Sequence, residues 1–208
     1  MLRARDLTLV YADAASEVRA VDGVSLEVKE GEFVGILGPS GSGKSSLLYL
    51  LAGLKRPVAG EVAFRDRPLA SLSADETAAL RRKEFGFIFQ NHFLIHYLTG
   101  LENVRTSGEG GSGRLLEELN VAHCSGKFPW QMSAGEKQRI SIARAVVHRP
   151  SVVFADEPTA ALDRPNAEIV VECLRRATAG GTLFMVTHDE SILKAATRVL
   201  RMEAGRLV

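Results

Sequence analysis

The chain has no excess of charge of either sign, because its 26 lysine and arginine residues nearly balance 25 aspartate and glutamate residues. No bulk electrostatic field therefore favours nucleic acid as a partner, and we expect no nucleic-acid binding. Cysteine is also scarce. The two that occur, Cys124 and Cys173, match no metal-binding or redox spacing, so we expect buried or spare thiols in a reducing compartment.

Long apolar runs are missing as well. The longest candidate, residues 47–54, is far shorter than the roughly 20 residues that cross a bilayer as a helix. The first six residues lack the apolar core of a signal peptide. We therefore expect a cytoplasmic protein without direct membrane insertion, which reaches the membrane only through a partner. A length of 208 residues suits one buried core, and we expect a single domain over 1–208.

What the chain does have is a glycine-rich loop between an apolar run and a predicted helix. Residues 38–45 fit the phosphate-binding pattern G-x-x-x-x-G-K-[ST], after the apolar run 33–37 and before the helical segment 46–54. Lys44 is predicted to contact the β- and γ-phosphates and Ser45 to ligate Mg²⁺. A glycine-rich turn that only caps a helix is the alternative. The predicted ATP-binding residues of this segment are Gly38, Pro39, Ser40, Gly41, Ser42, Gly43, Lys44, Ser45 and Ser46.

The remaining pattern predicts an α/β fold. Apolar residues alternate over 2–11 and 20–28, which predicts antiparallel strands joined by a surface loop over 12–19. Further on, apolar strands alternate with helices, as in a mostly parallel sheet covered on both faces. Strands are expected at 61–64, 85–89, 152–155 and 182–186, helices at 73–83, 135–148, 167–177 and 190–196, a flexible linker at 106–113, and a closing hairpin that turns at 204–205.

Two carboxylates, Asp156 and Glu157, follow the apolar strand 152–155. In a parallel sheet the strand exits share one edge with the phosphate loop, where open α/β sheets bind ligands. Asp156 could then hold Mg²⁺ beside Ser45, and Glu157 could deprotonate or orient the attacking water. A solvated strand end or a helix cap is the alternative interpretation of this pair.

Further motifs follow in an order that resembles the nucleotide-binding subunit of ABC transporters, across essentially the whole chain. Tyr11 resembles the aromatic residue that stacks on adenine, and Gln90 resembles the glutamine that senses Mg²⁺ and the γ-phosphate. Met132 to Glu136 resembles the signature sequence. The segments 161–163 and 187–189 resemble the D-loop and the switch-histidine segment.

The resemblance implies a P-loop NTPase with an antiparallel β lobe and a short helical lobe at about 91–135. Two subunits, identical or similar, would close head to tail on ATP, with the signature of one covering the nucleotide on the phosphate loop of the other. Ser133, Gly135 and Glu136 would then contact ATP in the partner. Glu157 would be the catalytic base, and His188 would contact the γ-phosphate. Gln90, with Ser45 and Asp156, would complete the Mg²⁺ site.

Within the family the segments 89–94, 101–104 and 155–159 look like the ATP-binding subunits of lipoprotein-releasing, macrolide-exporting and cell-division complexes. These subunits work with membrane permeases, so the expected location is the inner face of the cell membrane. Apolar residues at 93–98 could receive a coupling helix from a permease, or form the core of the helical lobe.

Two departures accompany this resemblance. Ala134 replaces the usual glycine of the signature, and the segment between Gln90 and Ser133 is shorter than expected. Two other functions stay open, a soluble or regulatory ABC-type ATPase without a transport substrate and a P-loop phosphotransferase. Glu157 and the signature-like residues count against a phosphotransferase, which would need neither.

Overall fold

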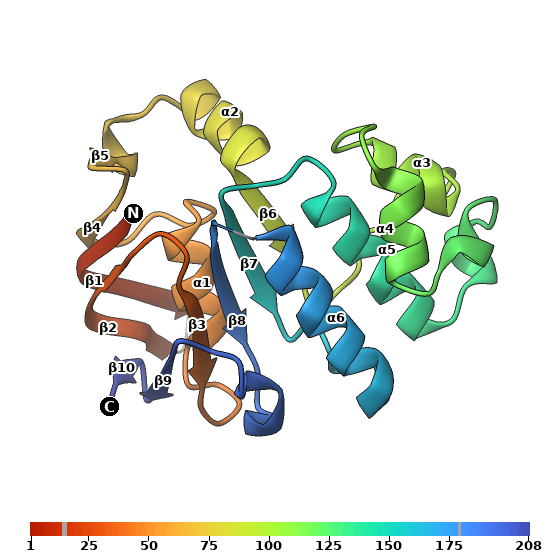
Figure 1. Cartoon of the computed structure of the whole chain (residues 1–208). Coiled ribbons are helices and arrows are strands. Elements are labelled where there is room, and N and C mark those ends of the chain that lie inside the picture. Colours follow the sequence, from red (N-terminus) through yellow and green to blue (C-terminus); the bar gives the residue numbers. More distant parts are fainter. Residues whose placement is uncertain (14–15, 179) are drawn as a thin grey trace. The chain divides into compact units, whose positions relative to one another are not determined.

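The structure is a computed structural model that describes residues 1–13, 16–178 and 180–208. The chain forms two compact units, one made of Met1–Arg81 with Phe184–Val208 and the other of Arg82–Leu183. Each unit is mixed α/β, as predicted (Figure 1). Among the described residues, no helix has both the length and the apolar character that a membrane span requires.

The first unit contains an antiparallel sheet with strand order β2-β1-β4-β5. Apolar side chains at Leu2, Ala4, Leu7 and Leu9 of β1 are buried, and the register shifts near Asp6, whose φ is 46°. The strands of this sheet are β1 (Leu2–Asp13), β2 (Ser16–Val28), β4 (Ala59–Phe64) and β5 (Arg67–Pro68).

The same unit holds strands in the order β10-β9-β3-β8, with β3 (Phe33–Leu37) parallel to β9 (Arg198–Glu203) and β10 (Arg206–Leu207) antiparallel to β9. All five residues of β3 are buried. Helix α1 (Lys44–Leu51) follows β3 after the glycine-rich loop. The other elements are η1 (Leu69–Ser71), α2 (Ala74–Glu84), β8 (Thr182–Val186) and η4 (Glu190–Leu193), and α2 and β8 each extend past a limit of the unit.

In the second unit, β6 (Phe85–Ile88) and β7 (Val152–Asp156) pair in parallel. Helix α5 (Ala134–Val146) packs against β6 and against the green helices α3 and α4 of Figure 1. Its buried face includes Ile140, Ile142, Ala143 and Val146. The remaining elements are α3 (Gly100–Arg105), α4 (Ser112–Glu118), η2 (Ala122–Cys124), η3 (Pro129–Gln131) and α6 (Arg164–Ala177).

Three local predictions were wrong. The loop expected over 12–19 is strand wherever the structure describes it, because β1 extends to Asp13 and β2 begins at Ser16. Residues 14–15 of that expected loop lie outside the described part. Ser112 and Gly113 belong to α4 instead of a linker, because Gly111 takes a left-handed N-cap conformation with a φ of 79°. The helix expected at 190–196 is a short 3-10 turn.

Candidate functional site

The glycine-rich loop has the backbone conformation that its sequence predicts. Gly41 and Gly43 have φ values of 78° and 98°, in the left-handed region that side chains disfavour. A Cβ atom at Gly43 would collide with the carbonyl oxygen of Ala20. Gly205 closes the loop from outside, since its N–H donates to the Ser42 carbonyl at 3.0 Å. The loop therefore delivers its N–H groups to the start of α1, a favourable place for anions.

Lys44 is the first residue of α1, and its side chain folds back over the loop. The ammonium group donates to the carbonyl oxygens of Gly38 at 2.9 Å and Pro39 at 2.8 Å. The residue is only 8% exposed, so its charge lies within the loop that would receive phosphate. An ammonium carries three donors, so these two bonds are compatible with contact to a phosphate oxygen.

Tyr11 lies beside the phosphate-loop helix. Its hydroxyl is 3.3 Å from the Ser46 hydroxyl, and the Lys55 ammonium lies over its ring at 5.3 Å from the centroid. The side chain is 40% exposed. Tyr11 is therefore an accessible aromatic side chain next to the predicted ATP-binding residues of the first unit, as adenine stacking requires.

His188 follows β8 in the first unit and is exposed. Thr187 before it is buried, and its N–H donates to the carbonyl of Ile36 in β3 at 3.2 Å. Asp189 after it caps the next turn by accepting the N–H of Ser191 at 2.8 Å. The exposed histidine thus lies between Thr187 and Asp189, which are both held in place by hydrogen bonds.

In the second unit, the two predicted carboxylates lie at the end of β7, and Glu157 is the first residue after the strand. Asp156 ends the strand and is 2% exposed. Glu157 has a φ of 50°, a left-handed conformation that costs a non-glycine residue on the order of 1 kcal/mol. Such strain is typical of functional positions. Asp156 is thus a buried carboxylate at the end of the strand, whereas at Glu157 the backbone turns away from the strand direction.

The signature residues form the N-terminus of α5. The Ser133 hydroxyl accepts the Glu136 N–H at 3.3 Å, and the Glu136 carboxylate accepts the Ser133 N–H at 2.7 Å, which is a capping box. Ser133 is exposed. At Gly135 a Cβ atom would lie 3.2 Å from Leu162 of the predicted D-loop, so glycine permits the close approach of that loop. Hydrogen bonds from Ser133 and His123 hold the pKa of Glu136 far below its usual range.

Ala134 does not distort this turn. It is the first helical residue of α5 and is absent from the non-glycine residues of positive φ in the described chain. A helical alanine carries no backbone penalty. The departure from the family's glycine therefore has a small conformational cost.

Gln90 is exposed at the start of the segment that follows β6. Arg144 of α5 anchors this segment, because its guanidinium donates to the carbonyl oxygens of His92 at 2.9 Å and Phe93 at 2.7 Å. Sequence reasoning gave Arg144 no role. The available signal was an arginine among the apolar residues of a predicted helix, since a partly buried guanidinium requires hydrogen-bond acceptors.

Asn103 holds the rest of the segment from within α3. The side-chain oxygen accepts the Ile95 N–H at 2.7 Å, and the amide nitrogen donates to the carbonyls of Ile95, Leu98 and Thr99 at 3.0–3.1 Å. The residue is fully buried. The predicted partner-binding segment is therefore a braced loop, in which Leu94 is buried whereas Phe93 and Tyr97 are 63% and 78% exposed.

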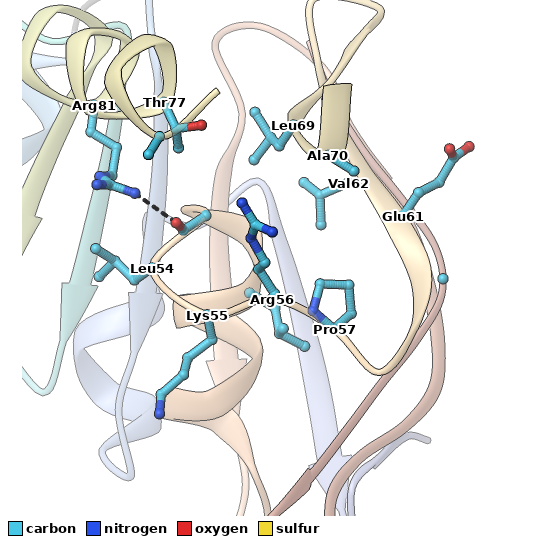
Figure 2. Close-up of a pocket in the computed structure, with 14 residues that line it drawn as sticks. Leu54, Lys55, Arg56, Pro57, Glu61, Val62, Leu69, Ala70, Thr77 and Arg81 are labelled. Atoms are coloured by element: carbon cyan, nitrogen blue, oxygen red, sulfur yellow. Dashed lines mark hydrogen bonds between the residues drawn. The ribbon is translucent and has the colours of Figure 1, made fainter. Parts of the chain in front are cut away.

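The first unit also contains a cavity of about 350 Å³ between the end of α1, β4 and α2. Figure 2 shows its lining, with Leu54 and Val62 beside the cations Lys55, Arg56 and Arg81. None of the predicted site residues lines it.

A model of the family described as ABC transporter matches residues 21–160, which is more than half of the chain. The chain belongs to the ABC transporter family. It is therefore a P-loop ATPase of the α/β class that binds ATP, as the resemblance implied.

Similar proteins cover the whole chain. An uncharacterized ABC transporter ATP-binding protein of Methanocaldococcus jannaschii is 37% identical over 100% of this chain and 98% of its own length. Macrolide export ATP-binding/permease proteins MacB of Hyphomonas neptunium and Paracoccus denitrificans are 39% and 40% identical over 100% of this chain. This chain spans 34% and 33% of the length of these two longer proteins.

The fold matches a solved structure titled as the dimeric post-hydrolysis state of the ATP-binding cassette MJ0796 bound to ADP and Pi. The TM-score is 0.92 at 34% identity, with coverage of 100% of this chain and 96% of that one. A second dimeric structure of MJ0796 gives the same TM-score of 0.92 at 35% identity. The predicted P-loop NTPase architecture is confirmed by this likeness.

Proposed function

We propose that the cassette is the ATP-hydrolysing subunit of a membrane complex in which ATP-driven dimer closure powers a permease for export, extraction or periplasmic work. The observation that carries this proposal is the exposed signature turn at the start of α5. Its capping box holds Ser133 and Gly135 at a helix N-terminus, where hydroxyl and N–H donors suit a γ-phosphate. A subunit that served only its own nucleotide would not need this second phosphate-binding turn.

The catalytic roles follow from the chemistry of the site residues. Lys44 and the loop N–H groups bind the phosphates, Glu157 deprotonates the attacking water, and His188 contacts the γ-phosphate. The hydroxyl of Ser45, the carboxylate of Asp156 and the amide of Gln90 are the oxygen donors that Mg²⁺ prefers, so they fit this ion. Bound Mg²⁺ would neutralise charge on the transferred phosphoryl group. The left-handed Glu157 and the buried Asp156 support this assignment.

The partner is a second cassette, identical or similar, together with a permease. MJ0796 is described as a dimeric cassette, and the MacB relatives combine ATP-binding and permease parts in one chain. These names support a location on the inner face of the cell membrane, reached through the permease. The exposed Phe93 and Tyr97 in the segment after Gln90 offer apolar contact to a permease.

The decisive experiment uses tagged Glu157→Gln protein. We expect the variant to bind Mg-ATP, to hydrolyse it far more slowly and to accumulate as an ATP-bound dimer, because the amide cannot accept the proton of water. Analytical ultracentrifugation with ATP measures the dimer, and phosphate release measures turnover. Glu168→Gln, an exposed glutamate in α6, is the matched control and should behave as the parent protein.

The same variant tests the partner. Pull-down from detergent-solubilised source membranes with Mg-ATP should recover a permease. Recovery of soluble proteins alone, with the ATP-bound dimer intact, would favour a regulatory ATPase without a transport substrate. Unchanged turnover in Glu157→Gln would remove this residue from its role as base. ATP turnover only in the presence of an added phosphate acceptor would favour a phosphotransferase.

A further inference from the structure

Three side chains of types that can ligate a metal ion lie together beside the signature turn. Of these, only Glu136 takes part in the proposed ATP chemistry. The group consists of His123 and Cys124 in η2 and Glu136 in α5, and their ligand atoms all lie within 4.8 Å of one another. The Glu136 Oε1 atom is 2.6 Å from His123 Nε2 and 3.3 Å from Cys124 Sγ. All three residues belong to the second unit.

The chemistry of these donors suits a borderline-soft divalent ion. Imidazole nitrogen, thiolate sulfur and carboxylate oxygen are the donors that zinc combines. In a tetrahedral zinc site, bond lengths of 2.0–2.3 Å place ligand atoms about 3.5 Å apart. The observed separations need only a small outward shift of His123, whose side chain is 56% exposed and can move. Mg²⁺ and Ca²⁺ prefer oxygen ligands and would not compete at a site with sulfur.

We propose that His123 Nε2, Cys124 Sγ and Glu136 Oε1 form a binding site for a divalent transition-metal ion of the zinc class, with water as fourth ligand. Binding converts the Cys124 thiol to a thiolate and requires neutral His123 to carry its proton on Nδ1 instead of Nε2. Starting from a neutral imidazole, one proton leaves to solvent for each ion bound, and no electron is transferred. The site does not depend on the proposed transport function.

The remaining contacts of Glu136 define what the ion must displace. The Glu136 Oε2 atom accepts the Ser133 N–H and keeps this bond, because the metal would use Oε1. Lys127 Nζ lies 3.5 Å from Oε1 and would be repelled by the ion. Its side chain is 37% exposed, so the ammonium can move into solvent. Occupation of the site would thus replace three hydrogen bonds at one oxygen by one metal bond.

The site would connect two parts of the chain at the signature. Glu136 forms the capping box with Ser133, whereas His123 and Cys124 belong to η2, which precedes η3 and the signature turn. A metal ion bound to all three would cross-link η2 to the start of α5. We therefore expect bound metal to slow hydrogen exchange at the N–H groups of 133–136.

The test uses Co²⁺ as a spectroscopic probe and Zn²⁺ as a competitor on the purified cassette. We expect one Co²⁺ per chain that shows a thiolate-to-cobalt charge-transfer band, which Zn²⁺ removes. The His123→Ala and Cys124→Ser variants should lose the band, with Zn²⁺ affinity lowered roughly tenfold or more. Cys173→Ser, at the other buried cysteine, is the matched control and should keep the charge-transfer band and the Zn²⁺ affinity of the parent protein.

Cys124 is buried, so the Cys124→Ser variant is first checked for folding by circular dichroism without metal. The exposed His123 is an independent variant that should fold normally. A charge-transfer band that survives in His123→Ala, or that disappears in Cys173→Ser, would overturn the proposed ligand set. Absence of any thiolate band in the folded parent protein would overturn the site itself.

Discussion

At the scale of single residues, the phosphate loop depends on a position that only glycine tolerates. We expect Gly43→Ala to lower ATP affinity at least tenfold, because the added methyl group meets the Ala20 carbonyl and the left-handed φ is strained. Titration with a fluorescent ATP analogue measures the affinity. Gly126→Ala is the matched control, since its Cβ would meet nothing within 4 Å, and it should bind ATP as the parent does. Equal affinities for the two variants would contradict the loop conformation.

The buried thiol of Cys173 makes a separate prediction about pH. Burial, followed by the nearby Glu118 carboxylate, raises the pKa of Cys173 from 9.0 to about 11. The folded state therefore favours the neutral thiol. Its contribution to the free energy of unfolding is complete below pH 9 and is lost as the pH rises through about 11.

Urea unfolding at pH 7 and pH 10.5 measures this loss. We expect Cys173→Ala to lower stability at pH 7 but to lose less stability between the two pH values than the parent protein. The comparison isolates Cys173, because every other side chain is the same in the two proteins. Parallel loss in the variant and the parent would show that the thiol does not contribute.

At the scale of elements, the two capping boxes of α2 and α5 allow the effect of a lost helix cap on stability to be distinguished from its effect on ATP hydrolysis. Ser73 and Ser133 each accept the N–H of a glutamate three residues later, at 3.2 Å and 3.3 Å. We expect Ser73→Ala and Ser133→Ala to cost about 1 kcal/mol of stability each, as N-cap losses do. Only Ser133→Ala should also slow ATP hydrolysis, because only its hydroxyl belongs to the proposed signature. Urea unfolding and phosphate release measure the two effects, and equal turnover in both variants would contradict the role of Ser133.

Helix α5 also carries Arg144, which we expect to hold the segment after Gln90. Arg144→Ala should speed hydrogen exchange across residues 91–99 and cost about 1–3 kcal/mol of stability, since two charge-assisted hydrogen bonds, one exposed and one partly buried, disappear. Arg144→Lys should lose less stability than Arg144→Ala but more than the parent protein, because an ammonium cannot donate in the forked geometry of a guanidinium. Arg114→Ala, which removes an exposed ion pair with Glu118, should change stability by less than about 1 kcal/mol. Unchanged exchange in Arg144→Ala would contradict the anchoring role.

At the scale of the whole molecule, the exposed side chains should matter only in the complex. We expect Tyr97→Ser to weaken recovery of the permease in the pull-down while ATP hydrolysis by the isolated cassette stays unchanged, because the side chain is 78% exposed. The matched control is Val58→Ser, at another large exposed apolar side chain with 68% exposure, in the turn before β4. Equal recovery with Tyr97→Ser and the parent would place the permease elsewhere on the surface.

The sequence predicted the parts of the molecule whose structure is local. The phosphate loop, the strand that ends at Asp156 and the helix predicted over 73–83 all depend on residues within a few positions of one another. The α/β class also followed, because the apolar periods of strands and helices differ. The roles of the individual site residues and the limits of the domain and its helical lobe stay predictions.

The features that the sequence did not predict depend on distant partners. Cys124 is buried, as one of the two interpretations had it, but its hydrogen bond to Glu136 was not predicted, because Glu136 lies twelve residues away in another element. Arg144 bonds to carbonyls more than fifty residues earlier, which no spacing rule reports. Residues 112 and 113 were assigned to a flexible linker and not to α4, because glycine suits a helix cap as well as a linker.

The bonds from Arg144 have a consequence for how this protein can diversify. The guanidinium donates to main-chain oxygens of residues 92 and 93, so these hydrogen bonds do not involve the side chains at the two positions. Position 92 can therefore accept different amino acids without loss of these bonds. Position 93 has a φ of 44°, a left-handed conformation that disfavours β-branched residues. Substitutions at position 92 can thus change the side chains of this loop while its main chain stays attached to α5.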